Sequence, residues 1–170
     1  ISYFISRTII RGYSEDLLTS SIENQANQIE AWLNENLAAF QMAKQAIEET
    51  NPQPAELQGI LDGYYGFNDN YPDGLYIADA DGNLMKAAGS GKTEADPAGA
   101  VWYQEGLTRW NMGFTKAYTN DAGAEVISAS GILKGDTGAL RVISADLTLE
   151  RISIIVNSYI GMDQARAFLV

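Results

Sequence analysis

The sequence contains no cysteine and no histidine among its 170 residues. Without cysteine, the chain can form neither disulfides nor thiolate metal sites. Without histidine, it lacks the commonest general base, the commonest metal ligand and any Ser-His-Asp triad. We therefore expect a protein that is not an enzyme and that holds no metal and no cofactor.

Basic residues are scarce. The chain has 11 Lys and Arg against 22 Asp and Glu, which gives a net charge of -11. Such a surface repels nucleic acids and anionic lipid headgroups, so no nucleic-acid partner is expected. Hydrophobic residues nevertheless make up 46% of the chain, which is enough to bury a core and argues against disorder.

Long hydrophobic runs are missing too, since no segment reaches the roughly 18 apolar residues that a transmembrane helix needs. The opening segment 1–10 is apolar, but Arg7 interrupts it. Two interpretations of this segment stay open. It is the exit of a transmembrane helix that lies upstream, or it forms the buried first turns of a soluble helix.

Residues 14–49 have the periodicity of one long helix and contain no proline or glycine. At 1.5 Å per residue this helix would be roughly 50 Å long, longer than a small core can cover. We expect it to protrude in part, or to pair weakly with a second copy of the chain. Its apolar residues recur every three or four positions and form one stripe: Ile22, Ala26, Ile29, Leu33, Leu37, Phe40, Ala43 and Ile47.

Two prolines in the segment 51–54 end this helix, and a short helix around residues 57–64 is expected to follow. The period then changes to two, which predicts strands at 75–78 and 84–87 joined by the turn 79–83. Residues 89–93 are expected to form a flexible loop.

A short helix carrying Trp102 and Tyr103 is predicted after Asp96-Pro97. Turn-rich connections then separate three predicted strands at 113–118, 125–133 and 139–145, and short connections favour antiparallel pairing. A final helix is expected at 147–159, with Asp146 as its N-cap. The fold class is α+β, a long N-terminal helix (1–50) packed on a five-stranded antiparallel sheet within the module 51–159.

Strand alternation predicts that one face of this sheet is apolar and the other is small and polar. The polar face, roofed by the Trp102 helix, is a candidate pocket for a small molecule. Trp102 and Tyr103 can equally be core residues, Asp146 only a helix cap, and Lys116 a solvated side chain. The candidate ligand-binding residues are Tyr76, Trp102, Tyr103, Lys116, Tyr118, Asn120, Ser128, Ser130 and Asp146.

Several short motifs occur in an order that resembles the PAS-like Cache family, specifically the membrane-distal module of double Cache sensors. They are Gly74-Leu75-Tyr76-Ile77-Ala78-Asp79 before the Asp81-Gly82 turn, Asp96-Pro97 before Trp102-Tyr103, Tyr118, Ser128-Ala129-Ser130, and Ile143-Ser144-Ala145-Asp146-Leu147. The resemblance implies a periplasmic or extracellular sensor in chemoreceptors, histidine kinases or cyclic-dinucleotide enzymes. It also implies that residues 160–170 are the entry strand of a truncated membrane-proximal module, although a C-terminal strand or a frayed end is the alternative.

Three polar groups of the amino-acid-binding subclass of Cache sensors are altered here. That subclass has an arginine where this chain has Ala100, a tyrosine where it has Ala95, and an aspartate where it has Asn120. Alanine cannot replace arginine as a bidentate partner for a carboxylate. We therefore expect an amine or a neutral polar ligand in preference to a carboxylate, with Asp146 as its main polar anchor.

The resemblance implies an extracytoplasmic ligand-sensing domain of a transmembrane signal-transduction receptor, such as a methyl-accepting chemotaxis protein of a bacterial cell membrane. The expected partners are a small-molecule ligand and a second copy of the chain, in a weak homodimer through the N-terminal helix. The alternative is a structural or protein-interaction module of a histidine kinase or diguanylate cyclase that binds no ligand.

Overall fold

A computed structural model of the chain describes residues 15–135 and 140–169. The apolar opening segment 1–10 lies outside this range. No helix within the described ranges is both long and apolar enough to cross a membrane. The described residues divide into two compact units, one of residues 36–151 and one of residues 15–35 together with 152–169.

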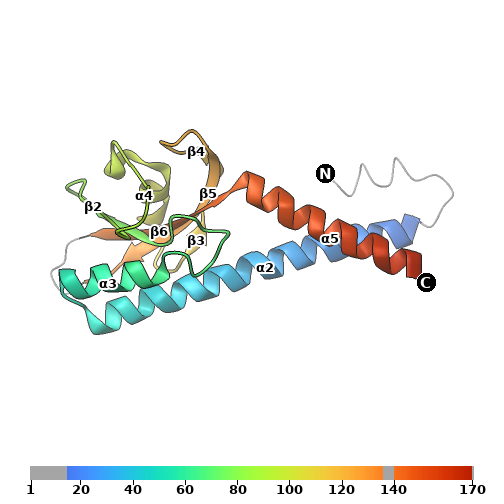
Figure 1. The fold of residues 1–170 in the computed structure, drawn as a ribbon, viewed down its shortest axis with the longest axis horizontal. Helices are drawn as coiled ribbons and strands as arrows, with labels where there is room; N and C mark the ends of the chain where they lie inside the picture. Colours follow the sequence, from blue (N-terminus) through green and yellow to red (C-terminus); the bar gives the residue numbers. More distant parts are fainter. Residues whose placement is uncertain (1–14, 136–139, 170) are drawn as a thin grey trace. The chain divides into compact units, whose positions relative to one another are not determined.

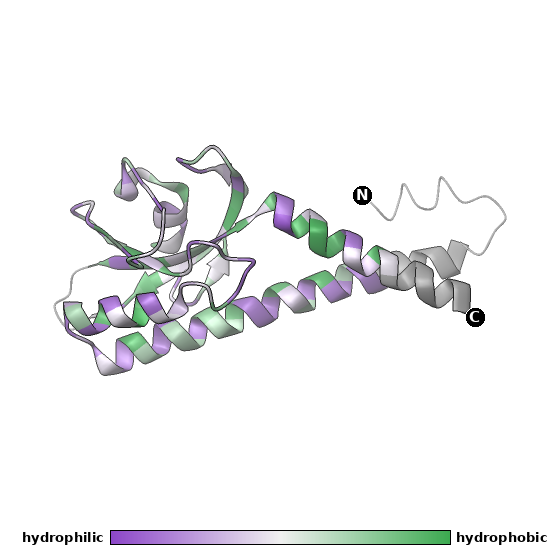
Figure 2. Ribbon diagram, viewed as in Figure 1, coloured by the Kyte–Doolittle hydropathy of each residue, from purple (hydrophilic) through white to green (hydrophobic). Residues whose placement is uncertain are grey.

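The first described element is the helix α2, Glu15–Thr50, which is continuous as predicted. Asn51 ends it with a left-handed φ of 41°, and its N–H donates to the carbonyl of Ile47. Such a left-handed residue is a common way to end a helix, and asparagine tolerates this conformation. Hydrophilic and hydrophobic residues mix along α2 and along the next helix, α3, Pro54–Tyr64 (Figure 2).

Six short or medium strands form one antiparallel sheet in the order β2-β1-β6-β5-β3, with β4 also paired to β5. The strands that occur first and last in the sequence, β1 and β6, are therefore neighbours near the middle of the sheet (Figure 1). Their bounds are β1 Tyr76–Asp79, β2 Leu84–Lys86, β3 Gly113–Phe114, β4 Tyr118–Thr119, β5 Glu125–Leu133 and β6 Arg141–Thr148.

The prediction of one strand at 113–118 is wrong in detail, because two short strands, β3 and β4, occupy this segment. Thr115 lies between them. Its hydroxyl accepts the N–H of Ser128 at 3.0 Å, in the place of a backbone carbonyl. A side chain thus replaces one link of the ladder, which interrupts the strand without changing the predicted topology.

The two faces of the sheet differ as predicted. Helix α3 and the second half of α2 lie along one face, and the short helix α4, Val101–Gly106, lies over the other (Figure 1). A 3-10 turn, η1 Pro97–Gly99, precedes α4. The face toward α2 and α3 carries a continuous buried apolar layer of Leu75, Ile77, Ala129, Ile143, Ala145 and Leu147.

The C-terminal helix α5 spans Leu149–Leu169, so its predicted start at residue 147 and end at residue 159 are wrong. Strand β6 continues to Thr148, whose hydroxyl accepts the N–H of Arg151 at 3.1 Å. Thr148 therefore caps α5, and the prediction that Asp146 is the cap is wrong, because Asp146 still belongs to the strand.

The expected entry strand at 160–170 is helical through residue 169. This segment is rich in residues that favour helix, such as methionine, glutamine, alanine and arginine, and a single glycine at residue 161 does not end it. A second module after this segment stays a prediction.

Candidate functional site

A buried hydrogen-bond network centres on Asp146, near the end of β6. Ser128 lies directly across on β5 and donates its hydroxyl to Asp146 Oδ1 at 2.6 Å. Tyr76 on β1 donates its hydroxyl to the same oxygen. Since Ser128 gives its one proton to Asp146, the Tyr118 hydroxyl, 2.6 Å away, donates to Ser128. Ser144 donates to the Tyr76 hydroxyl at 3.1 Å. Side chains from the strands β1, β4, β5 and β6 thus form one network around a single carboxylate.

Lys92 completes this network from the segment that follows β2. Its ammonium lies 2.7 Å from Asp146 Oδ2 and 3.6 Å from Glu94 Oε2. The same nitrogen lies 4.5 Å from the centre of the Tyr76 ring, within the range of a cation–π interaction. Lys92 is only 5% exposed. The expectation that residues 89–93 form a flexible loop is therefore wrong at this position, because Lys92 is anchored in the interior.

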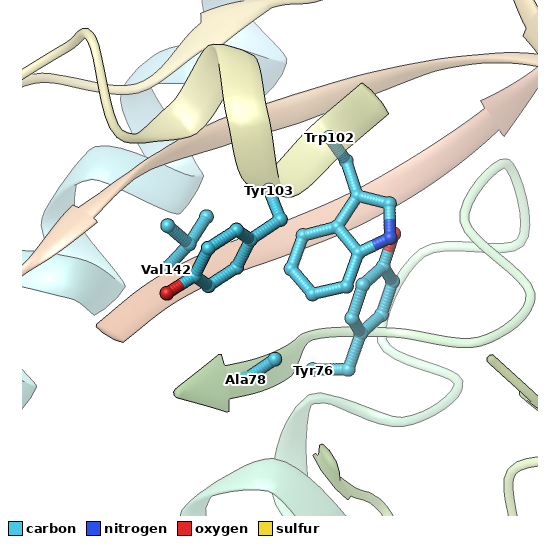
Figure 3. Close-up of a cluster of buried hydrophobic side chains, with 5 residues drawn as sticks. All are labelled: Tyr76, Ala78, Trp102, Tyr103 and Val142. Atoms are coloured by element: carbon cyan, nitrogen blue, oxygen red, sulfur yellow. The ribbon is translucent and has the colours of Figure 1, made fainter. Parts of the chain in front are cut away.

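Aromatic side chains of α4 form the roof of the polar face. The Trp102 ring meets the Tyr76 ring edge-on at 4.8 Å, and Tyr103 lies 5.9 Å from Trp102. Figure 3 shows both side chains hanging from α4 toward the sheet, where Ala78 and Val142 complete the cluster. This part of the polar face is filled by the chain itself.

Helix α4 can lie this close to the sheet because its last residue is a glycine. A Cβ on Gly106 would come within 2.5 Å of a Val142 methyl carbon and 3.3 Å of the Ser130 hydroxyl. The Arg109 guanidinium donates to the Gly113 carbonyl at 2.6 Å and lies 3.4 Å from the same Ser130 hydroxyl. These contacts fix the roof over β5 and β6.

A cavity of about 280 Å³ opens beside the network, between the segment 94–101 and the segment 118–121. Three carboxylate residues line it, and none of its described lining residues is Lys or Arg. All three positions at which the chain departs from the amino-acid-binding Cache pattern also lie in the lining. The lining residues are Glu94, Ala95, Asp96, Gly99, Ala100, Val101, Tyr118, Thr119, Asn120 and Asp121.

Buried carboxyl groups make this part of the molecule electronegative. Burial raises the pKa of the Glu94 carboxyl above its ordinary value, an effect that the Lys92 ammonium opposes and the Asp121 charge reinforces. Burial also raises the pKa of the Asp73 carboxyl, and the Asp146 charge adds to this shift. Lys92, with Lys86 near Asp73, thus faces several carboxylates, and an added positive charge beside the acidic lining would be favoured here.

Burial is the main cause of raised pKa values for the two tyrosines of the network. The hydroxyls of Tyr76 and Tyr118 become harder to ionise because they are buried and because Asp146 is negatively charged. Both therefore act as neutral hydrogen-bond donors at physiological pH. The buried Oε2 of Glu94 makes no well-formed hydrogen bond among the described residues, and its charge is offset by the Lys92 ammonium at 3.6 Å and, less strongly, by the indole N–H of Trp102.

The structure brings together six of the nine predicted site residues. Tyr76, Tyr118, Ser128 and Asp146 share the hydrogen-bond network, and Trp102 and Tyr103 roof it. The other three lie apart. Lys116 is exposed, Asn120 lines the cavity while its side chain accepts the Ala124 N–H at 3.0 Å, and Ser130 lies beside Arg109.

Sequence reasoning missed Lys92 and Glu94. Neither belongs to a periodic strand or helix, so alternation cannot orient them. The one local signal is a lysine and a glutamate two residues apart in the segment before Asp96-Pro97, and that spacing alone does not indicate burial. Among the described residues, no group of three or more acidic side chains is arranged to hold a metal ion.

No protein-family model matches the chain, and no curated protein is significantly similar to it in sequence. Several solved structures share its fold. The ligand-binding domain of the Pseudomonas aeruginosa chemoreceptor PctC, in complex with GABA, has a TM-score of 0.73 at 20% identity over 84% of this chain. That of PctB from the same organism, with L-Arg, has a TM-score of 0.72 at 21% identity over 87% of this chain.

The ligand-binding domain of the Pseudomonas fluorescens chemoreceptor CtaA, in complex with L-alanine, has a TM-score of 0.70 at 23% identity over 82% of this chain. The chain spans 62% of that domain, 63% of the PctB domain and 67% of the PctC domain. The predicted PAS-like α+β architecture is thereby confirmed, and the chain has the fold of chemoreceptor ligand-binding domains.

Proposed function

We propose that the chain is an extracytoplasmic ligand-sensing domain of a transmembrane signal-transduction receptor, a methyl-accepting chemotaxis protein being the simplest case. The observation that carries this proposal is the acidic cavity beside the buried network of Asp146, on the sheet face roofed by α4. Polar groups that converge next to a concave surface are typical of small-molecule sites. The hydroxyls that pair with the Asp146 carboxylate belong to Ser128 and Tyr76, which are fully buried and do not line the cavity, so the proposed role is recognition and not catalysis.

The charge of the cavity favours an amine or a neutral polar ligand over a carboxylate. Glu94, Asp96 and Asp121 line it, and Ala100 stands where the amino-acid-binding Cache subclass has an arginine. A ligand ammonium would gain from these carboxylates, whereas a ligand carboxylate would be repelled. L-Arg, L-alanine and GABA, the ligands in the neighbouring chemoreceptor structures, each carry both an amino group and a carboxylate, so the preference proposed for this chain rests on the charge of its cavity and not on those ligands.

A thermal-shift screen of the wild-type domain tests this proposal. Amines, sugars and dicarboxylates should be compared at equal concentration and ionic strength. A ligand at 100 times its dissociation constant stabilises the folded state by about 2.7 kcal/mol, and we expect amines or neutral polar compounds to give the largest shifts. A screen in which dicarboxylates alone shift the midpoint would contradict the proposed ligand class.

The Ala100→Arg variant tests the site itself. The new guanidinium would lie at the cavity wall and offer a bidentate partner to a carboxylate. We expect the variant to lose affinity for simple amines and to gain affinity for ligands with a carboxylate. The matched control is Ala122→Arg, which adds the same charge at an exposed turn outside the cavity lining. Equal responses of the two variants would show that the cavity is not the site.

A specific observation also favours a second function, a structural or protein-interaction module of a histidine kinase or diguanylate cyclase. Asp146 is already paired with Lys92, and the space under Trp102 is filled by the aromatic cluster. A domain of this kind needs no ligand for its stability. Absence of any hit in the metabolite screen, together with capture of another sensing domain, would favour this alternative.

We further propose weak homodimerisation through α2. Ile29, Leu33 and Leu37 of its apolar stripe are only half-buried in the single chain. Stripes of this kind pair helices side by side. Sedimentation at rising concentration should show reversible association, and Leu33→Glu should abolish it. A wild-type protein that stays monomeric at millimolar concentration would contradict the proposal.

A further inference from the structure

The segment 87–95, which follows β2, turns into the domain and carries Lys92 to the centre of the polar face. Lys92 is held there by main-chain contacts as well as by its charge. Its N–H donates to the Ser90 hydroxyl at 3.1 Å, and its carbonyl accepts from the Lys86 ammonium at 2.6 Å. Ser90 and Lys92 are both buried. The backbone of this segment is therefore fixed so that the Lys92 side chain points inward.

The surroundings of the Lys92 ammonium form a site for one cation. Asp146 Oδ1 already accepts from Tyr76 and Ser128, which leaves Oδ2 as the oxygen that faces the ammonium. The Tyr76 ring lies 4.5 Å from the nitrogen and offers its negative face. A carboxylate oxygen beside an aromatic face is the arrangement that recognises an organic ammonium ion.

We infer that Lys92 is a tethered ammonium that occupies the cation site of Asp146 and Tyr76, so that it excludes free amines from this inner site and directs ligand recognition to the Glu94 cavity. Lys92 is thus a specificity-determining residue. This second part of the inference rests on the proposed sensing function, whereas the occupancy of the inner site does not.

The tether gives Lys92 a large advantage over a free amine. A group linked to its site has an effective concentration in the millimolar range or above, and here the backbone of the segment is fixed as well. A free amine would have to displace Lys92 and leave a buried lysine unpaired, which is strongly unfavourable. Glu94, by contrast, lines the cavity, and the Lys92 ammonium lies 3.6 Å from its Oε2 but 2.7 Å from Asp146 Oδ2, so Glu94 is the less firmly paired carboxylate. The ammonium of a ligand would therefore meet Glu94 first.

Chemical rescue of Lys92→Ala tests the occupancy. The substitution keeps Cβ and removes Cγ, Cδ, Cε and Nζ, which together have the size and charge of n-propylammonium. We expect added n-propylammonium to raise the unfolding midpoint of the variant in a saturable manner, with an apparent affinity about tenfold or more above that of the wild type. Methylammonium lacks the stem and n-propanol lacks the charge, so both should rescue less.

Two further variants make the rescue specific. In Lys92→Ala/Asp146→Asn the carboxylate partner is missing, so n-propylammonium should give no rescue. Lys116→Ala removes an exposed lysine and should respond to the amine no more than the wild type does. Rescue that survives Asp146→Asn, or a wild-type response as large as that of Lys92→Ala, would overturn the inference.

Acetylation of the wild-type protein by an amine-reactive ester keeps the inference testable if Lys92→Ala fails to fold. Mass spectrometry should find Lys92 modified far more slowly than the exposed Lys116 and Lys134, and equal rates would overturn the inference. The metabolite screen is independent of these results. Rescue without any metabolite hit would contradict the sensing function and support the role of Lys92. A metabolite hit without rescue would support the sensing function and contradict the role of Lys92.

Discussion

Two lysines, Lys44 and Lys92, are buried within the described ranges, and their surroundings differ. Lys44 on α2 is 1% exposed and pairs with Glu48 one turn further along the same helix, at 3.0 Å. Lys92 pairs with Asp146, which is 54 residues away in the sequence. The Glu48 side chain keeps 13% of its surface exposed, whereas the Asp146 side chain keeps 2%.

The exposure of the two carboxylates determines how each ion pair contributes to the fold. Glu48 retains access to water and also accepts the Lys134 N–H at 2.8 Å, so its pair with Lys44 fastens the end of β5 to the helix. Asp146 has exchanged water for a complete set of protein partners. A carboxylate that is fully removed from water is costly to leave unpaired. Losing one partner of the Lys92–Asp146 pair should therefore destabilise the protein more than losing one partner of the Lys44–Glu48 pair, and the Asp146 site is filled by one specific cation.

The largest expected effect is that of Asp146→Ala. Removing one partner of a buried ion pair costs about 3–5 kcal/mol, because Lys92 and the Tyr76 hydroxyl lose their common partner. Glu48→Ala should cost less, about 1–3 kcal/mol, since water can reach the Lys44 pair through Glu48. Chemical denaturation of both variants measures the contrast. Equal losses would show that the two pairs are equivalent.

The roof over the Lys92 pair gives the next effect. Gly106→Ala places a Cβ within 2.5 Å of Val142, and overpacking of this kind costs about 1–3 kcal/mol. Its matched control is Gly59→Ala on α3, where an added Cβ meets nothing within 4 Å. Alanine is the better helix former, so the control should gain about 0.5–1 kcal/mol. The midpoints of thermal unfolding of the two variants should therefore shift in opposite directions from that of the wild type.

A smaller loss is expected for Thr148→Ala, which separates the helix cap from the network two residues earlier. Thr148 accepts the Arg151 N–H, and loss of such a cap costs about 1 kcal/mol. The variant should leave the acetylation rate of Lys92 unchanged, whereas Asp146→Ala should raise it. A faster modification of Lys92 in Thr148→Ala would show that cap and network are not independent.

The smallest effect concerns Glu94, the second carboxylate near Lys92. Burial raises the folded-state pKa of Glu94 above its ordinary value of 4.5. Between pH 4.5 and this higher pKa, the folded state therefore keeps a proton that the unfolded state has released. This contribution to stability is present below pH 4.5 and is lost as the pH rises through the folded-state pKa.

Glu94→Gln removes this loss, so the variant should be slightly more stable than the wild type at pH 7 and show a flatter pH dependence above pH 4.5. Denaturant unfolding from pH 4 to pH 7 measures it. A wild-type free energy of unfolding that rises from pH 4 to pH 7, with the rise absent in Glu94→Gln, would contradict this prediction.

Local patterns predicted much of the fold. The bounds of α2 differ by one residue at each end from the predicted 14–49, because the apolar stripe and the break at Asn51-Pro52 are features of consecutive residues. Alternation also placed Tyr76, Ser128 and Asp146 on one face correctly, because side-chain direction in a strand follows from parity alone.

The errors arise where a side chain takes over a backbone role or where partners are distant. The hydroxyl of Thr115 replaces a carbonyl and divides one expected strand into two. Thr148, and not Asp146, caps the last helix, because the strand continues three residues beyond its predicted end at residue 145. Lys92 lies in an aperiodic segment, and its partner Asp146 lies on the distant strand β6. No local pattern could therefore indicate that Lys92 is buried.

The position of β6 has a consequence for the synthesis of the protein. This strand lies between β1 and β5 although it is made last of the six, and Ser144 contacts Tyr76 across 68 residues of sequence. Contacts of such long range form late and slow folding. Until residue 148 has left the ribosome, β1 and β5 each expose an unpaired edge, and such edges associate with other chains. A nascent chain that ends near residue 140 should therefore aggregate, and one that extends past residue 148 should fold.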